Sequence, residues 1–296
     1  MAEPFIVTDT GLRVFAPAKI NLYLLISGKR PDGFHEIDTL MSKIDWYDEL
    51  LFEPGQTDVI ELLCRGPYWA PSGPDNLVYR ACAALLAHAG HSVGLRVTLT
   101  KNIPAGTGLG SASSDAAAAL LGLNRFARLN QPPEVLHTIA AQLGSDIAFF
   151  LYGPAAICTG RGEKLSPVEQ HFTFDALVLT PNISVSTISV YKNYIHDPDT
   201  YRRWAGQIKP LLRKKSIDSV AEICANMLEQ SCFSLHGELA ELKNQCQAFC
   251  GRKVCLSGSG SAMYILNPDR QQMPRLQRWL KQTYNCDSRF VTYNRW

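Results

Sequence analysis

The chain has 296 residues, 46% of them hydrophobic, which is enough for a sizeable buried core and for two domains. Its formal net charge of +2 excludes the basic excess typical of nucleic-acid-binding proteins, so we expect a small-molecule partner and no nucleic acid. Because no apolar run approaches the ~18 residues of a membrane span and no signal peptide is evident, we expect a cytoplasmic protein without a membrane partner.

The first informative stretch is residues 12–27, which contains two β-like apolar runs separated by Pro17. Lys19 and Asn21 lie two residues apart, so in a strand they share one face. A lysine in so apolar a stretch needs a partner. The alternative is an ordinary edge or surface lysine, and the stretch alone does not decide between them.

The next stretch is a turn over residues 30–35, signalled by Pro-Asp-Gly. It presents Phe34 and His35 side by side at the edge of a loop. An aromatic face and an imidazole together can stack on, and hydrogen-bond to, a heteroaromatic base. Equally simple is a structural role, with Phe34 in the core and His35 in solvent.

Residues 36–63 alternate as strands do, and their acidic residues are expected to be solvated. These acidic residues are Asp38, Asp45, Asp48 and Glu49. Asp75 and Asn76 are good caps for a helix over residues 77–89, whose apolar positions fall on one face. Residues 94–100 are predicted to form a strand that leads directly into a glycine-rich loop.

That loop spans residues 101–115, with glycines at positions 106, 108 and 110, and a helix is predicted to follow over residues 116–129. Glycines allow close approach of a ligand, and a helix N-terminus favours phosphate. The loop matches neither a P-loop nor a dinucleotide fingerprint, because no lysine follows Gly110 and Ser113 stands where the fingerprint has Gly or Ala. The sequence therefore predicts a phosphate cradle, with a plain glycine turn before a core helix as the alternative.

A further helix is predicted from Pro132-Pro133 to Gly144, and Asp146 follows it beside an apolar segment. A carboxylate next to Phe149 and Phe150 is costly unless a cation or several hydrogen bonds meet it. The alternative is a helix N-cap without functional meaning. The turn at residues 160–163 marks the predicted domain boundary.

In the second half we predict a strand over 176–179, an extended segment over 181–189 and a charged, helical surface region over 197–215. Residues 253–266 form a strand, a small-residue loop and a strand, which is either a plain hairpin or a second backbone wall for an anionic substrate. A helix over 271–284 and a strand over 289–293 complete the chain. The nine scattered cysteines, without a Cys-x-x-Cys pair, are expected to be reduced thiols and not metal ligands.

Several of these segments together resemble the GHMP kinase superfamily, and the resemblance spans nearly the whole chain. The resemblance is most specific at residues 17–22, 31–35 and 103–115. Residues 144–147, 160–165 and 257–260 support it. The Gly-Phe-His element points to the branch whose substrate carries cytosine. One departure is that Ser111 and Ala112 stand where that branch usually has glycines.

The resemblance implies an α+β, two-domain GHMP kinase fold. Residues 1–164 would form the ATP-binding domain and residues 165–296 the C-terminal domain, with the active site in the cleft between them. The implied reaction is ATP-dependent phosphorylation of the 2-hydroxyl of 4-diphosphocytidyl-2-C-methylerythritol, in isoprenoid precursor biosynthesis. The alternatives are a homoserine- or mevalonate-type kinase, a non-catalytic nucleotide-binding regulator and, with least support, a Rossmann oxidoreductase.

The resemblance also implies roles for individual residues. Asp146 would orient or accept the proton of the substrate hydroxyl, with Lys19 beside it. The implied ATP-binding residues are Asn76, Lys101, Pro104, Ala105, Gly106, Thr107, Gly108, Leu109, Gly110, Ser111, Ala112, Ser113 and Ser114. The implied substrate-binding residues are Asn21, Phe34, His35, Asp146, Thr187, Tyr191, Gly258 and Gly260. Mg²⁺ is expected to accompany ATP, with no metal ligand assigned.

Overall fold

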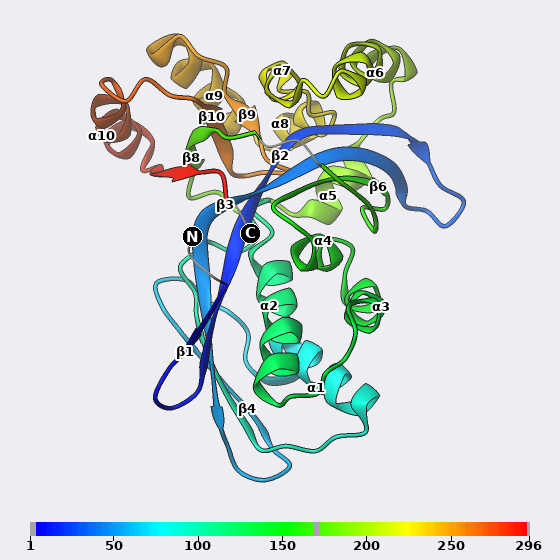
Figure 1. Cartoon of the computed structure of the whole chain (residues 1–296). Helices are drawn as coiled ribbons and strands as arrows, with labels where there is room; N and C mark the ends of the chain where they lie inside the picture. The colour runs from blue at the N-terminus through cyan, green and yellow to red at the C-terminus, as the bar shows by residue number, and fades with distance from the viewer. Residues whose placement is uncertain (1–3, 169–171, 295–296) are drawn as a thin grey trace.

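A computed structural model describes residues 4–168 and 172–294 of the chain. Two β-sheets with helices packed on them make up the fold, which is of the α+β class (Figure 1). Within the described part of the chain, no helix is both long enough and apolar enough to cross a membrane.

The larger sheet has seven strands and is formed by the first part of the chain. Its main path runs β1-β2-β3-β5-β4, with β6 paired to β3 and β7 paired to β6. All of these pairs are antiparallel except β4 with β5. The strands are β1 (Phe5–Val7), β2 (Leu12–Lys29), β3 (His35–Pro54), β4 (Ile60–Arg65), β5 (Leu95–Thr100), β6 (Ala155–Gly160) and β7 (Lys164–Pro167).

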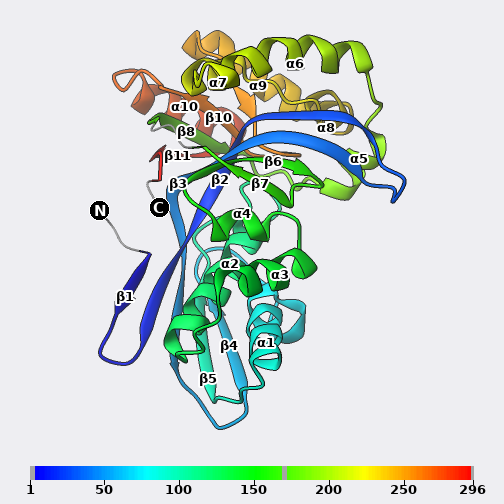
Figure 2. The ribbon, with the colours of Figure 1, turned by 45° about the vertical axis from the view of Figure 1, so that its right-hand side comes forward.

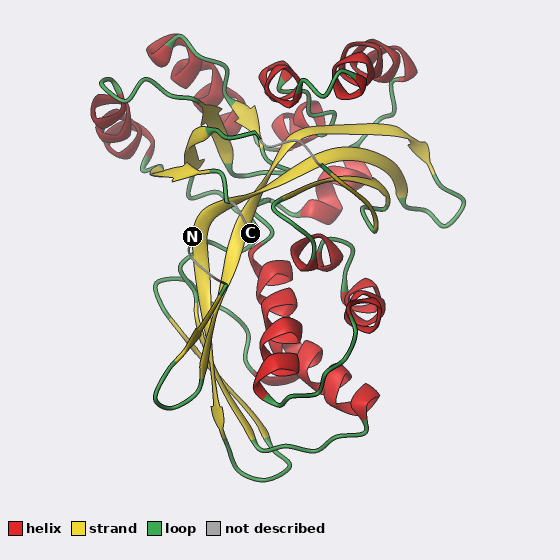
Figure 3. Ribbon diagram, in the orientation of Figure 1, coloured by secondary structure: helices red, strands yellow, loops and turns green. Residues whose placement is uncertain are grey.

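The helices of the first part of the chain lie together beside this sheet, as Figure 3 shows. They are the 3-10 turn η1 (Gly73–Asp75) and the helices α1 (Leu77–Ala89), α2 (Ser111–Phe126), α3 (Pro133–Leu143) and α4 (Ile147–Leu151). Asn76 caps α1 through a hydrogen bond from the Val78 amide to its side-chain oxygen, at 2.8 Å. The predicted helix over residues 77–89 and its cap are therefore confirmed.

The described residues from 172 to 294 form a smaller, four-stranded sheet of order β11-β8-β10-β9, with six helices. The strands are β8 (Asp175–Thr180), β9 (Cys255–Leu256), β10 (Met263–Leu266) and β11 (Asp287–Thr292). The helices are α5 (Thr187–Asn193), α6 (Pro198–Arg213), α7 (Ile217–Ile223), α8 (Glu229–Leu235), α9 (Gly237–Cys250) and α10 (Met273–Tyr284). The predicted hairpin, closing helix and last strand are thus confirmed.

Strands β2 and β3 run through both parts of the molecule (Figure 2). The first half of β2, with Leu12 and Val14, belongs to the core beneath α1 to α4, whereas residues such as Ile20 and Leu24 pack in the core of the C-terminal part. The prediction that Pro17 separates two strands is wrong. A register shift between Pro17 and Ala18 lets a single strand continue through the proline. The larger sheet ends at Pro167, and the division after residue 164 remains a prediction.

Three other expectations are corrected. Asp48 is fully buried and not solvated, because it pairs with Lys101. Residues 187–189, which were expected to be extended, are the first residues of helix α5, because the Ser186 side chain caps the helix start by accepting from the Ser189 amide.

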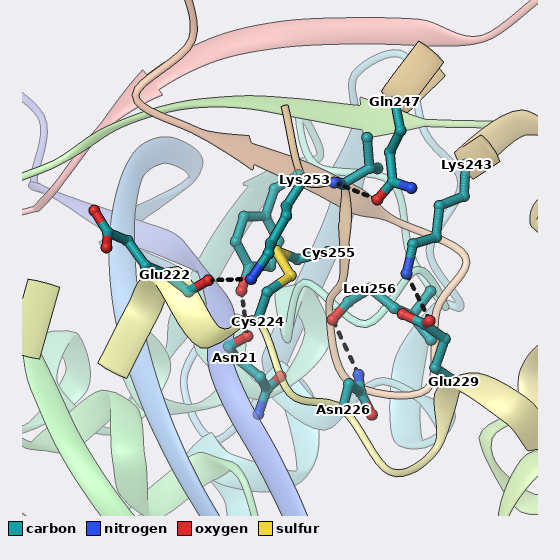
Figure 4. The surroundings of a disulfide bond; sticks show 12 residues. Asn21, Glu222, Cys224, Asn226, Glu229, Lys243, Gln247, Lys253, Cys255 and Leu256 are labelled. Atoms are coloured by element: carbon teal, nitrogen blue, oxygen red, sulfur yellow. Dashed lines mark hydrogen bonds and ion pairs between the residues drawn. A yellow bond between two sulfur atoms is a disulfide. The ribbon is translucent and has the colours of Figure 1, made fainter. Parts of the chain in front are cut away.

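The third correction concerns the cysteines, which were expected to be reduced. Cys224 and Cys255 form a disulfide that joins the end of α7 to β9 (Figure 4). Just beyond the bridge, the Asn226 side-chain amide donates to the Leu256 and Gly258 carbonyls, at 3.0 and 2.8 Å. The bridge is therefore next to the loop that connects β9 to β10.

Candidate active site

A cavity of about 950 Å³ lies between the two parts of the molecule. Its walls come from β2 and β3, the glycine loop and the start of α2, the turn between α3 and α4, helix α5 and the loop between β9 and β10. Four cationic side chains line it: Lys19, Lys29, Arg161 and Lys192. Among the described lining residues Asp146 is the only carboxylate, so the cavity suits an anionic ligand.

The glycine loop turns three times through left-handed backbone conformations. The φ angles are +69° at Gly106, +80° at Gly108 and +71° at Gly110. At Gly108 an added Cβ would lie 2.1 Å from the Ser257 carbonyl oxygen, and at Gly110 it would press on Lys19 and Phe150. Glycine is therefore required here by close approach of backbone and side chains.

Three hydrogen bonds fix this loop to both parts of the molecule. The Lys19 amide donates to the Leu109 carbonyl at 2.9 Å, which holds the loop on β2. The Ala262 amide donates to the Thr107 carbonyl at 2.9 Å, and the Ser257 hydroxyl to the Gly108 carbonyl at 3.1 Å. The small-residue loop after β9 is therefore docked on the glycine loop.

Helix α2 begins directly after the glycine loop, with Gly110 as its N-cap residue and no side-chain cap. Gly110, Ser111, Ala112 and Ser113 all line the cavity. The first amide groups of a helix have no partner within the helix and attract anions. This geometry supports a phosphate site here and not a plain turn before a core helix.

Lys19 and Asp146 meet at the cavity, with 3.8 Å between the Lys19 Nζ and an Asp146 carboxylate oxygen. The Lys19 Nζ also donates to the Asn21 side-chain oxygen at 2.6 Å, and the Asn21 amide donates to the Thr39 hydroxyl at 2.9 Å. Burial lowers the pKa of Lys19, and the Asp146 carboxylate acts in the opposite direction. The lysine in an apolar strand thus has the partner that the sequence required.

Asp146 precedes α4 but makes no capping hydrogen bond to it. Its side chain is 32% exposed, whereas that of Lys19 is 4% exposed. A half-open carboxylate held by a buried cation is accessible to a ligand in the cavity. Asp146 therefore occupies the N-cap position of α4 without capping it through its side chain, so capping does not account for this carboxylate.

The predicted base-binding residues Phe34, His35 and Tyr191 also line the cavity. The His35 ring contacts Tyr191 and Tyr194, each with 5.4 Å between ring centroids. Phe34 is 54% exposed, and the Arg161 guanidinium lies over its ring at 5.1 Å. Burial lowers the pKa of His35, and the nearby Lys29 and His196 lower it further.

Another part of the cavity wall comes from the loop after β9 and from the start of α5. A Cβ added to Gly258 would lie 3.4 Å from the Lys19 Nζ and 3.3 Å from the Asn21 side-chain oxygen. The Thr187 and Ser259 hydroxyls are hydrogen-bonded at 2.8 Å. Both residues line the cavity, as do Lys19 and Asp146.

Six of the predicted site residues do not line the cavity in the described structure. They are Asn76, Lys101, Ala105, Leu109, Ser114 and Gly260. Asn76 caps α1, and its amide donates to the Pro71 carbonyl at 2.7 Å. Lys101 is buried among acidic groups, and Gly260 packs under Cys232 and Leu256.

Sequence reasoning missed three cationic residues of the cavity. Lys29 is the last residue of β2, Arg161 lies in the turn at residues 160–163, and Lys192 follows Tyr191. Nothing in the sequence distinguishes them from solvated surface charges. Only the three-dimensional arrangement brings them to one cavity.

We predict that Gly108→Ala lowers the free energy of unfolding by roughly 3 kcal/mol, because a left-handed conformation and overpacking add up. Gly106→Ala is the matched control, since Gly106 has a similar φ but no atom within 4 Å of an added Cβ. This control should cost only about 1–2 kcal/mol. Urea unfolding of both variants measures the difference, and equal losses would show that docking on Ser257 does not constrain the loop.

The sequence of the chain matches two family models and several curated proteins that agree with one another. The family model of the GHMP kinases N terminal domain matches residues 76–154, and that of the GHMP kinases C terminal matches residues 208–286. A 4-diphosphocytidyl-2-C-methyl-D-erythritol kinase from Geobacillus sp. (strain WCH70) is 34% identical over 95% of this chain and 96% of its own length. The kinase of the same name from Methylacidiphilum infernorum (isolate V4) is 40% identical over 88% of this chain and 87% of its own length.

A solved structure agrees with these sequence matches. The crystal structure of a 4-(cytidine 5'-diphospho)-2C-methyl-D-erythritol kinase superposes with a TM-score of 0.76 at 31% identity. The superposition covers 95% of this chain and 99% of the solved one. The chain therefore belongs to the GHMP kinases and, among them, to the family of the 4-diphosphocytidyl-2-C-methyl-D-erythritol kinases.

Proposed function

We propose that this protein transfers the γ-phosphoryl group of ATP to the 2-hydroxyl of 4-diphosphocytidyl-2-C-methyl-D-erythritol, giving the 2-phosphate and ADP, in isoprenoid precursor biosynthesis. The observation that carries the proposal is the contact between Lys19 and Asp146, 3.8 Å apart, at a cavity that the glycine loop also lines. The names of the relatives supply the substrate.

The ATP phosphates are proposed to lie along the glycine loop and the start of α2. This is supported by the free amide groups of the helix start and by the cationic lining of the cavity. Of the loop residues, Pro104, Gly106, Thr107, Gly108, Gly110, Ser111, Ala112 and Ser113 line the cavity. Lys101 and Asn76 are then supporting residues and not direct ligands of the nucleotide.

In the proposed reaction the substrate hydroxyl oxygen attacks the γ-phosphorus, and the bond to the bridging oxygen of ADP breaks. The hydroxyl proton passes to the Asp146 carboxylate. Because the transition state is loose and an alcohol is hardly deprotonated near neutral pH, Asp146 acts mainly by holding the oxygen in line. Lys19, fixed by Asn21 and paired with Asp146, is proposed to provide a positive charge close to the reacting oxygens.

Mg²⁺ is proposed to arrive with ATP. No group of three His, Cys, Asp or Glu residues in the described ranges 4–168 and 172–294 could hold a metal ion. The one lining carboxylate, Asp146, already faces Lys19. A cavity with few carboxylates fits an ion that keeps phosphate oxygens and water as its ligands, where it would neutralise charge on the phosphates.

The cytosine is proposed to lie beside the aromatic lining residues of the cavity, Phe34, His35 and Tyr191. A neutral imidazole has one nitrogen that donates and one that accepts, which matches the edge of a cytosine. The lowered pKa of His35 keeps the ring neutral at pH 7. Because His35 already contacts Tyr191, a base stacked between Phe34 and Tyr191 would have to displace that contact.

Substrate identity is tested by ADP release with three candidate acceptors. We expect turnover with 4-diphosphocytidyl-2-C-methyl-D-erythritol and only background release with homoserine or mevalonate. Homoserine and mevalonate have no base that could contact the aromatic lining residues. A coupled assay at saturating ATP measures this. Faster turnover of homoserine or mevalonate would replace the proposed substrate.

The contribution of His35 is tested by pH dependence. As the pH falls through the lowered pKa of His35, below the usual 6.5, the ring becomes a cation and can no longer accept. We therefore expect the KM for the cytidyl substrate to rise roughly tenfold at acidic pH while the KM for ATP changes little. His35→Gln should raise this KM at all pH values and remove the pH dependence.

The matched control for this experiment is His91→Gln, because His91 is exposed and does not line the cavity. Its pH profile should equal that of the wild type. An unchanged acidic rise in KM in the His35 variant would mean that another group titrates and that His35 does not contact the base.

A further inference from the structure

Three charged side chains are buried together beneath the start of α2. Lys101 follows β5, Asp48 belongs to β3 and Asp115 to α2, and their side chains are only 2%, 0% and 4% exposed. The Lys101 Nζ lies 2.6 Å from an Asp115 carboxylate oxygen and also contacts Asp48 and the Ser111 hydroxyl. We call Lys101, Asp48 and Asp115 the buried triad.

The two carboxylates of the triad differ in how many donors they meet. Asp48 accepts from the amides of Asn102 and Ile103, from Lys101 and from the Ser111 hydroxyl. Among the donors in the described part of the chain, Lys101 alone meets Asp115, and none reaches its second, buried oxygen. One cation therefore serves two acids, of which Asp48 is far better satisfied as an anion.

Desolvation makes a second negative charge in this place costly. With both acids ionised the triad would carry a net negative charge, whereas one proton makes it neutral. Burial raises the pKa of Asp115 well above its usual range, and Asp48 raises it further, while Lys101 opposes both. The hydrogen-bond pattern and the cost of burial thus assign the shared proton to Asp115.

The triad is connected to the proposed phosphate site through Ser111. An ammonium group can only donate, so the Ser111 hydroxyl accepts from Lys101 and donates to Asp48, at 3.0 Å. Ser111 is the first residue of α2 and lines the cavity. The triad therefore holds the helix end that lines the cavity at the proposed phosphate site.

We propose that Asp115 is a positioning residue that works in its protonated form, holding Lys101 and the start of α2 without adding negative charge beneath the nucleotide phosphates. This inference rests on the proposed binding of ATP at the glycine loop. Ionised Asp115 would repel the phosphates and weaken nucleotide binding. The titratable groups that face Asp115 are Lys101, Asp48 and Cys64 of β4, and burial raises the pKa of that thiol.

The test compares wild-type protein with Asp115→Asn, which keeps the shape of the protonated acid but cannot ionise. The dissociation constant of a non-hydrolysable ATP analogue is measured from acidic to alkaline pH. For the wild type we expect affinity to fall about tenfold as the pH rises through the pKa of Asp115, from one added charge near the phosphates. Asp115→Asn should bind as tightly as the wild type in acid and lose this fall.

A wild-type affinity that is flat with pH, or an Asn variant tenfold weaker at every pH, would overturn the proposal, because Asp115 would then act as an anion. The pH dependence of thermal stability gives a second test of whether Asp115 is protonated. Since the folded protein binds the proton more tightly than the unfolded chain, wild-type Tm should decline relative to that of Asp115→Asn as the pH rises above about 4. A relative gain in wild-type Tm would contradict the assignment.

Infrared spectroscopy of protein labelled with ¹³C-aspartate tests the protonation without nucleotide, activity or the Asp115 variant. We expect the carbonyl band of a protonated carboxyl group in the wild type at neutral pH. In Asp48→Asn the band should disappear, because Asp115 then ionises to pair with Lys101. Absence of the band in the wild type would overturn the proposal even if the kinase assignment holds, and its presence would stand even if the proposed substrate fails.

Discussion

The ion pair between Lys19 and Asp146 is the interaction on which the geometry of the site depends. A lysine in the middle of a buried strand is unfavourable unless other groups stabilise its charge, and the pair partner comes from the turn before α4. Two glycines allow the chain to close around this lysine. A Cβ at Gly110 would press on its stem and one at Gly258 would lie 3.4 Å from its Nζ.

Because β2 and β3 contribute to both hydrophobic cores, Lys19 is held by the same strand that joins the two parts of the molecule. Backbone hydrogen bonds tie the glycine loop to β2 and to the loop after β9. The surfaces proposed for nucleotide and for substrate are therefore fixed relative to each other before either ligand binds. This preorganisation is what phosphoryl transfer needs, since positioning and charge carry most of its rate.

Local features of the chain were largely predictable, because their causes lie within a few residues. The Asn76 cap, the glycine loop and the hairpin after Lys253 follow from capping, backbone freedom and strand pattern. Pairing between residues far apart in the sequence could not be predicted. Asp48 was misjudged because its partner Lys101 lies 53 residues further along, and the bridge between Cys224 and Cys255 spans 31 residues.

The site shows the same division. Lys19 and Asp146 were singled out because each was costly by itself, although their pairing came from the resemblance. The placement of Lys101 and Asn76 at the nucleotide also came from the resemblance, and in the structure both residues make supporting contacts. Lys29, Arg161 and Lys192 carried no sequence signal, because a solvated charge and a cavity charge look alike until the chain is folded.

The most direct measurement is a double-mutant cycle on kcat with Lys19→Met, Asp146→Asn and the double variant, with binding of an ATP analogue checked for each. If the two side chains act on one hydroxyl, each single change should lower kcat by about 10²–10⁴ with nucleotide binding retained, and the double variant should lose little more. Losses that multiply in the double variant, or normal turnover by Asp146→Asn, would contradict the account.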